Sequence, residues 1–347
     1  MANFISFPPS DNFNTALYDG TGSSQAVTGV GFQPDLVWLK NRPSNYVPVV
    51  FDSVRGVQEQ LVSSTTAAES TEASTLTAFG ADGFTVISAN EVNRSGDAFV
   101  GWNWRGGTTS GITTNGSTTI TPLAYSFNAD AGISIIKFTG NDTAGAGLPH
   151  GLGVAPQWVV CKTLGGANNW NVYQRWVGNQ YWIDLNDSAA KGTATNRWND
   201  TDPDSVNVYL GSTGATNGSG GDSPIICYAF APKKGFSFMG KYEGNGNADG
   251  PFQFSGFRPA FLMIRNMGSG DWFMYDSKRE GYNEDNDYLK ANENTLEQAD
   301  VDIDLLSNGF KIRNTSSGQN GAGSNYVWLA FAVFPVVSSN SKAGVAR

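Results

Sequence analysis

The stretch that decides the fold reads Gly31-Phe32-Gln33-Pro34-Asp35-Leu36-Val37-Trp38-Leu39-Lys40. It recurs as Gly153-Val154-Ala155-Pro156-Gln157-Trp158-Val159-Val160-Cys161-Lys162 and as Gly256-Phe257-Arg258-Pro259-Ala260-Phe261-Leu262-Met263-Ile264-Arg265. In all three copies a proline precedes a continuous apolar run, which is typical of a short strand buried on both faces. The proline marks the start of that strand because it has no N–H to donate to a sheet. The sequence therefore predicts one β unit written three times, marked by Pro34, Pro156 and Pro259 and by the closing cations Lys40, Lys162 and Arg265.

A second landmark recurs further along the copies. Asp52 is followed by Arg55 in the first copy, and Asp276 is followed by Arg279 in the third. An enzyme seldom needs the same pair twice in one chain, so we expect each pair to be a structural ion pair or a bond that fixes a turn. The second copy lacks this pair, and only the aromatic residue before it is retained, as Tyr173.

The composition favours strands and turns. Glycine supplies 42 of the 347 residues, and aromatic residues supply 12%. Glycine, threonine, serine, asparagine and aromatic residues all disfavour helix relative to turns and strands. Pairs such as Asp82-Gly83 and Asn308-Gly309 join antiparallel strands in tight hairpins. We therefore expect an all-β protein of three tandem antiparallel β-sandwich repeats, jelly-roll-like in form.

The repeats set the expected domain boundaries. Residues 1–104 form the first β-sandwich repeat with an N-terminal arm, residues 133–235 the second repeat, and residues 236–347 the third repeat with a polar C-terminal tail. Residues 105–132 are rich in glycine and threonine, and they form either a linker or added strands.

The charge excludes some partners. Lys and Arg number 22 against 31 Asp and Glu, so the net charge is −9, and no basic run is present. A protein that binds nucleic acid or an anionic membrane surface needs a concentrated basic surface, so we expect neither partner. No signal peptide and no apolar run of membrane-spanning length is found, so membrane insertion is not expected either. Cys161 and Cys227 lie in apolar runs, which predicts buried free thiols, with a disulfide as the alternative.

Few residues suggest catalysis or metal binding, and no cofactor is expected. His150 is the single histidine, and its place in a Gly-Pro loop predicts a solvated side chain. Asp300, Asp302 and Asp304 alternate, which would place three carboxylates on one face of a strand. A solvated face is the preferred interpretation of these acids; a weak calcium site and a pair of glycosidase carboxylates are the alternatives.

The second copy carries more aromatic residues than the others, with asparagine and glutamine between them. Sugar binding requires aromatic faces beside polar side chains, but a sandwich core or an intersubunit surface requires the same residues. A core or interface role is preferred, and glycan binding is the alternative for Trp170, Trp176, Tyr181, Trp182 and Trp198.

Several segments resemble a known family. The run Ala131–Asn141, the run Asp249–Phe252 with Ser255–Ala260, and the run Leu305–Lys311 are similar to a β-rich repeat of unassigned function in structural proteins of tailed bacteriophages, frequent in marine phages. The resemblance extends from about Leu17 to Pro335 and is closest in the third copy.

The resemblance implies a structural function and not an enzymatic one. It implies a non-enzymatic virion protein, assembled in the host cytoplasm, that belongs to a tail fibre, tail tip or baseplate. The expected partners are other virion proteins, further copies in a homo-oligomer and a host-surface glycan, with Met1–Asn14 as a candidate docking arm or else a disordered end. A head-decoration protein and a sandwich-fold glycan-cleaving enzyme are the alternatives.

Overall fold

Three large antiparallel sheets carry most of the chain, and a smaller sheet faces each of them. The computed structural model describes residues 7–332 apart from residues 222, 280–282, 284–285 and 301. Within these residues helix is confined to three short turns, η1 (Pro9–Asp11), α1 (Asn90–Asn93) and α2 (Gly214–Asn217). The protein is therefore all-β with antiparallel sheets, as the composition predicts.

Unit 1, residues 13–104, has a large sheet in the order β1-β9-β3-β4-β5-β6 and a small sheet in the order β2-β8-β7. Its strands are β1 (Phe13–Asp19), β2 (Gln25–Thr28), β3 (Leu36–Asn41), β4 (Val49–Asp52), β5 (Glu59–Val62), β6 (Ser70–Thr71), β7 (Leu76–Gly80), β8 (Gly83–Val86) and β9 (Ala98–Trp104).

Unit 2, residues 124–230, has a large sheet in the order β10-β11-β18-β13-β14-β15-β16 and a small sheet of β12 and β17. Its strands are β10 (Ala124–Asn128), β11 (Ile133–Phe138), β12 (Ala146–Pro149), β13 (Trp158–Thr163), β14 (Asn171–Gln174), β15 (Tyr181–Asp184), β16 (Gly192–Thr193), β17 (Asn207–Leu210) and β18 (Ile225–Phe230).

Unit 3, residues 237–331, has a large sheet in the order β19-β27-β21-β22-β23-β24 and a small sheet in the order β20-β26-β25. Its strands are β19 (Ser237–Glu243), β20 (Phe252–Phe254), β21 (Phe261–Asn266), β22 (Trp272–Asp276), β23 (Asn286–Lys290), β24 (Gln298–Asp300), β25 (Ile303–Leu306), β26 (Gly309–Ile312) and β27 (Asn325–Phe331).

The three large sheets share one strand order. Apart from the additional edge strand β10, the first strand of each unit pairs with the last, and the last pairs with the strand that follows the recurring proline. That third strand is buried at all six positions in β3, β13 and β21, as its apolar run predicts. The reason is that its two faces meet different cores: Trp38 belongs to a core at the centre of the molecule, and Val37 and Leu39 belong to an outer core of unit 1.

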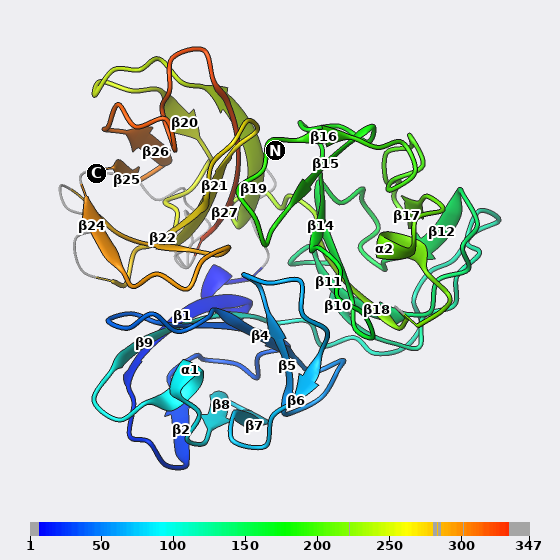
Figure 1. Ribbon diagram of the computed structural model, residues 1–347, viewed down its shortest axis with the longest axis horizontal. Coiled ribbons are helices and arrows are strands. Elements are labelled where there is room, and N and C mark those ends of the chain that lie inside the picture. Colours follow the sequence, from blue (N-terminus) through cyan, green and yellow to red (C-terminus); the bar gives the residue numbers. More distant parts are fainter. Residues whose placement is uncertain (1–6, 222, 280–282, 284–285, 301, 333–347) are drawn as a thin grey trace.

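One apolar core lies where the inner faces of the three large sheets meet, and Figure 1 shows the three units grouped around this centre. Unit 1 contributes Trp102 and Trp104, unit 2 Trp158 and Trp170, and unit 3 residues such as Trp272. Each unit also has an outer core between its large and small sheets. The units are therefore not independent sandwiches in a row, because the inner face of every large sheet is covered by the other two units.

The segment between units 1 and 2 adds a strand. β10 lies at the edge of the second large sheet and pairs with β11 over five residues. Of the two alternatives for residues 105–132, the added strand is the one that the structure shows for Ala124–Asn128.

The described part of the candidate N-terminal arm is packed. Phe13 is fully buried in the central core, and the ring of Phe7 contacts Phe236 edge-on at 5.4 Å between centroids. Residues 1–6 and the polar C-terminal tail from Val336 lie outside the described residues.

Candidate functional site

The closing cations of the recurring stretch lie at the boundaries between units, which we call seams. Lys162 of unit 2 donates to the carbonyl of Thr66 in unit 1 at 3.2 Å, and Arg265 of unit 3 donates to the carbonyl of Ala189 in unit 2 at 2.5 Å. Lys40 of unit 1 donates to its own Tyr46 carbonyl at 2.5 Å and is attracted by Glu293 of unit 3. Lys162 therefore reaches the loop after β5, Arg265 reaches the loop after β15, and Lys40 is attracted toward the loop after β23.

Burial of these cations changes their titration. Burial lowers the pKa of Lys40 to about 8, with Glu293 opposing the shift, and burial lowers the pKa of Arg265 to about 10. A buried cation that hydrogen-bonds carbonyl oxygens stays satisfied without a carboxylate in contact. The sequence showed that the three cations recur, but their inter-unit contacts appear only in the structure.

The Asp-Arg pairs are buried ion pairs at the same seams. Asp52 Oδ2 lies 2.5 Å from Arg55 Nε, and Asp276 Oδ2 lies 2.6 Å from Arg279 Nε, with no exposed side-chain area in either pair. The other oxygen of Asp52 accepts the backbone N–H of Arg55, and that of Asp276 accepts the N–H of Arg279, which closes a tight turn. Burial opposes the charge on Arg55, but Asp52, Tyr228 and Glu69 outweigh it and raise the pKa of Arg55.

A side chain from the following unit completes each pair. The hydroxyl of Tyr228 in unit 2 donates to Asp52 Oδ2 at 2.6 Å, and the indole N–H of Trp102 in unit 1 donates to Asp276 Oδ2 at 3.1 Å. Tyr228 and Trp102 occupy the same position on the last strand of their units, two residues before Phe230 and Trp104. We call each of these three-residue groups a latch, because it joins one unit to the next.

The third seam has an uncharged version of the latch. Gln174 of unit 2 stands where the other units have aspartate, and its Oε1 accepts the N–H groups of Trp176 and Val177 in the same turn. Val177 replaces the arginine, and Leu329 of unit 3 replaces the donor from the following unit. Both charges and the donor from the following unit are thus lost together, as expected if a buried charge is tolerated only with its partners.

Three buried asparagines went unnoticed in the sequence. One fully buried asparagine recurs in each unit: Asn93, Asn217 and Asn320. Its side-chain oxygen accepts a backbone N–H from the loop after β1, β11 or β19. Its side-chain N–H groups donate to carbonyls of that loop and of a second segment. Each is followed three residues later by a glycine, a recurring signal that would have identified them. They fix loops within a unit.

The aromatic glycan candidates divide into two sets. Trp170 and Trp198 are each 1% exposed and lie in the central core and the outer core of unit 2. This corrects the glycan interpretation for these two residues, because a ring without an exposed face cannot stack on a sugar. Their preferred role, as core residues, is the one observed.

The other three candidates reach the surface. The ring of Trp182 lies against the backbone of Gly192, and the Arg197 guanidinium is 4.5 Å from its centroid. Tyr181 is half-buried against the central core. Trp176 is the most exposed of the three, with 42% of its surface accessible.

The acidic run does not form one strand face. β24 ends at Asp300 and β25 begins at Ile303, so Asp302 lies between two strands. Asp302 is buried and accepts hydrogen bonds from Tyr275 at 2.8 Å and from Asn314 at 2.5 Å. Asp304 is paired with Arg313 at 2.6 Å. This corrects the expectation of three aligned carboxylates, and no group of acids, histidines or cysteines suited to a metal ion is present among the described residues.

His150 is buried, which contradicts its prediction as a solvated loop residue. Its Nδ1 accepts the N–H of Leu152 at 3.1 Å, and Nε2 lies 3.1 Å from the carbonyl of Asp204, so the neutral Nε2–H tautomer satisfies both contacts. Burial lowers the pKa of His150 to about 4. The sequence showed the loop but not that residues 204–206 cover it.

Cys161 and Cys227 are buried free thiols, as preferred from their apolar surroundings. They face each other across β13 and β18, with 3.2 Å between the sulfur atoms.

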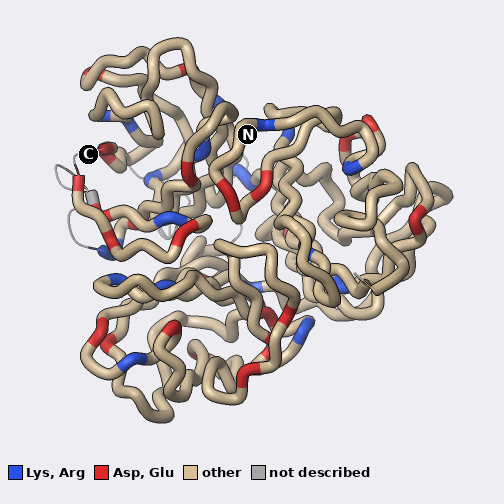
Figure 2. Tube along the Cα trace, viewed as in Figure 1, with Lys and Arg blue, Asp and Glu red and all other residues tan. Residues whose placement is uncertain are grey.

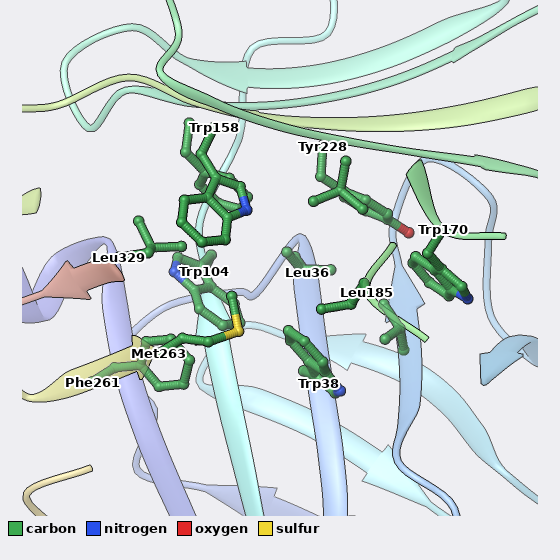
Figure 3. Close-up of a pocket in the computed structure, with 13 residues that line it drawn as sticks. Leu36, Trp38, Trp104, Trp158, Trp170, Leu185, Tyr228, Phe261, Met263 and Leu329 are labelled. Atoms are coloured by element: carbon green, nitrogen blue, oxygen red, sulfur yellow. The ribbon is translucent and has the colours of Figure 1, made fainter. Parts of the chain in front are cut away.

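The centre of the core holds a small apolar cavity of about 40 Å³. Figure 3 shows its walls, which come from all three units: Leu36 and Trp104, Trp158 and Tyr228, and Met263. The lining has no polar surface, so the cavity resembles a packing defect between three sheets and not a ligand site.

Residues of both charges are spread along the described part of the chain. Figure 2 shows acidic and basic residues interspersed over all three units. None of the described helices is long and apolar enough to cross a bilayer.

Comparisons with known proteins identify one family. Residues 8–335 match the family model described as Domain of unknown function (DUF7483). No curated protein matches the chain, and no solved structure matches it. Because the match takes in all three units, the chain belongs to the family Domain of unknown function (DUF7483).

Proposed function

We propose that the protein is a non-enzymatic structural component of a tailed-phage virion, carried on a tail fibre, tail tip or baseplate and assembled with other virion proteins. The observation that supports a structural role most directly is the use of the buried polar groups. Asp52 and Asp276 each hold a turn and a neighbouring unit together, and the buried cations join loops of adjacent units. These groups join the three sheets to one another around their shared core.

The residues that first suggested chemistry are also in structural use. Both ring nitrogens of His150 are occupied by backbone groups, and the Asp302 carboxylate accepts three side-chain donors, from Tyr275, Asn314 and Gln319. Burial raises the pKa of Asp302. A carboxylate enclosed by structural donors is poorly placed to transfer a proton to a substrate.

We further propose that each unit is a jelly-roll-like sandwich copied in tandem. The nested pairing of β1 with β9 and of β2 with β8, repeated as β19 with β27 and β20 with β26, supports this. Such sandwiches are common in viral capsid proteins. Fusion of three copies around one core would give a rigid body that presents loops and sheet edges on its outside.

The location can be tested by immunogold labelling. Antibodies raised against the purified chain would be applied to particles released from a host that carries this gene. Gold at the tail or baseplate is the expected result. Gold spread over the shell would support a head-decoration protein instead, and particles without the protein would contradict the virion assignment.

The absence of catalysis can be tested separately. The purified chain is incubated with bacterial surface polysaccharides, and new reducing ends are measured. We expect none above the background of a heat-inactivated sample. New reducing ends that disappear in Asp302→Asn would contradict the proposal and favour the glycan-cleaving alternative.

A further inference from the structure

The turn at the seam between units 2 and 3 carries an exposed aromatic side chain, Trp176, at a position where the other two seams have an aliphatic residue or a lysine. Trp176 follows Gln174 by two residues, and its N–H donates to the Gln174 side chain at 2.7 Å. Val54 and Lys278 make the equivalent N–H bonds to Asp52 and Asp276, so the three residues occupy one position of the repeat. The repeat therefore provides two internal controls for Trp176.

The other two units use this position to seal a seam. Val54 packs against the central core, and Lys278 donates through its Nζ to the carbonyl of Thr15 in unit 1 at 2.6 Å. Trp176 does neither of these things: it belongs to none of the buried clusters and 42% of its surface is exposed. An exposed aromatic ring held by a fixed turn offers an apolar face to a ligand at little cost in conformational entropy.

Two cations lie beside this ring. Lys241 Nζ is 5.1 Å from the ring centroid, and the guanidinium carbon of Arg175 is 5.8 Å from it, both within the range of a cation–π contact. Both side chains are exposed, and in the part of the chain that the structure describes neither forms an ion pair with a carboxylate. Both are available to an anion from solution.

One of these cations is peculiar to this seam. Lys241 lies in β19 opposite Val327, where unit 2 likewise has a lysine, Lys137, opposite Ile226 and unit 1 has Leu17 opposite Val100. Arg175 stands where units 1 and 3 have Ser53 and Ser277. Trp176 and Arg175 thus depart from the repeat in one turn of unit 2, and Lys241 of unit 3 lies beside them, in a protein whose net charge is −9.

A second ring and a third cation lie close to this turn. The ring of Tyr181 is 3.5 Å from where a Cβ on Gly178 would stand, and Gly178 is two residues beyond Trp176. Lys191 Nζ lies 4.0 Å from the Tyr181 centroid, and the Lys191 backbone N–H donates to Met267 of unit 3 at 3.0 Å. The seam therefore presents aromatic surface and positive charge together.

The geometry points to a binding site for an acidic saccharide at the seam of units 2 and 3, with Trp176 as the stacking surface and Arg175 and Lys241 as the partners of the sugar carboxylate. Sugar rings offer apolar C–H faces to an aromatic ring, and a carboxylate forms strong charge-assisted hydrogen bonds with guanidinium and ammonium groups. A neutral sugar would use only the ring. This inference does not depend on the virion assignment, because the site is argued from the seam alone.

The test is calorimetric titration of the full chain with matched oligosaccharides. Oligomers of galacturonate, glucuronate and sialic acid are compared with neutral oligomers of galactose and glucose of the same length. We expect saturable binding of at least one acidic oligomer, about tenfold tighter than its neutral counterpart, and weaker in high salt. Equal binding of acidic and neutral oligomers, or no binding of any acidic oligomer up to about 10 mM, would overturn the proposal.

The variants are taken from the repeat itself. Trp176→Val, Arg175→Ser and Lys241→Leu each introduce the residue of unit 1 at an exposed position, so the chain is expected to fold. Trp176→Val should weaken acidic-oligomer binding at least about tenfold, and each cation variant should weaken it several-fold and reduce its salt dependence. Phe254→Thr is the matched control, because Phe254 is 61% exposed on β20, where unit 1 has Thr28. Unchanged affinity in Trp176→Val, or an equal loss in the Phe254 control, would refute the site.

Discussion

The latch between units 1 and 2 offers the sharpest test of how the units are held together. Replacing Arg55 with valine, the residue that unit 2 carries at the equivalent position, leaves Asp52 buried without its cation. Tyr228 still donates to Asp52, but the carbonyls of Val50 and Glu59 lose their guanidinium donors. The single variant therefore creates a buried charge and two unsatisfied acceptors.

The size of the effect follows from these contacts. Removing one partner of a buried ion pair costs about 3–5 kcal/mol, because the remaining charge stays desolvated. The triple variant Asp52→Gln, Arg55→Val, Tyr228→Leu introduces the uncharged residues that stand at the equivalent positions of the third seam, Gln174, Val177 and Leu329. The triple variant leaves no buried charge without its partner, so its remaining cost comes from the volume lost in Arg55→Val and Tyr228→Leu. We expect the triple variant to lose at least about 2 kcal/mol less than Arg55→Val alone.

The assay is urea unfolding at pH 7, followed by tryptophan fluorescence and by far-UV circular dichroism. The two variants are compared with the wild type by the free energy of unfolding. Surface ion pairs provide the control: Arg94→Ala removes the Arg94–Asp97 contact, in which the arginine side chain is 46% exposed, and should cost less than about 1 kcal/mol. A triple variant that is as unstable as Arg55→Val, or an Arg55→Val protein as stable as the wild type, would refute the reasoning about coupled loss.

Three further effects are expected from single positions. Gly20→Ala should lower the free energy of unfolding by more than about 2 kcal/mol, because a Cβ there would stand 2.1 Å from the carbonyl oxygen of Arg94. Gly116 lies in open space, so Gly116→Ala should change the free energy of unfolding by less than about 0.5 kcal/mol. Equal effects of the two substitutions in denaturant titration would contradict this. Val160→Ile should stabilise the protein by about 1 kcal/mol by filling part of the 40 Å³ cavity, and a lower melting temperature would show that the cavity does not accept a methyl group. Burial lowers the pKa of His150 from 6.5 to about 4, so the unfolded chain takes up a proton first as the pH falls. The stability that the neutral ring provides is therefore complete above pH 6.5 and is lost towards pH 4. The free energy of unfolding should fall by about 3 kcal/mol over this range. His150→Gln should remove that part of the pH dependence in unfolding titrations from pH 7 to pH 4, and an unchanged slope would contradict the assignment.

The local pattern of the chain predicted local structure well. The apolar runs after Pro34, Pro156 and Pro259 are the strands β3, β13 and β21, buried on both faces as expected. Asp82-Gly83 lies in the tight hairpin between β7 and β8. These features depend on neighbouring residues, which the sequence displays directly.

Contacts between distant segments were less predictable. Nothing near His150 shows that the segment around Asp204 covers it, and nothing near Asp302 shows that Tyr275 and Asn314 surround it. The shared central core was also not foreseen. A strand buried on both faces is expected equally in an isolated sandwich and in a sheet covered by a neighbouring unit.

Only the fold distinguished the exposed aromatic candidates for glycan binding from the buried ones. Trp170 and Trp176 look alike in the sequence, but Trp170 donates to the Val62 carbonyl of unit 1 from inside the core, and Trp176 stays at the surface. The replacement of Asp52 and Arg55 by Gln174 and Val177 was visible as a departure of the second copy. That Leu329 stands at the position of Tyr228 and Trp102 is seen only in the strand pairing.

The central claim is that three β units share one core and are coupled by contacts across every seam. Scanning calorimetry of the full chain measures this coupling directly, through the ratio of the calorimetric to the van't Hoff enthalpy of unfolding. We predict a single transition with a ratio near one, and a shift of the whole transition in Arg55→Val. Two or three resolved transitions, with only one of them moved by Arg55→Val, would contradict the claim.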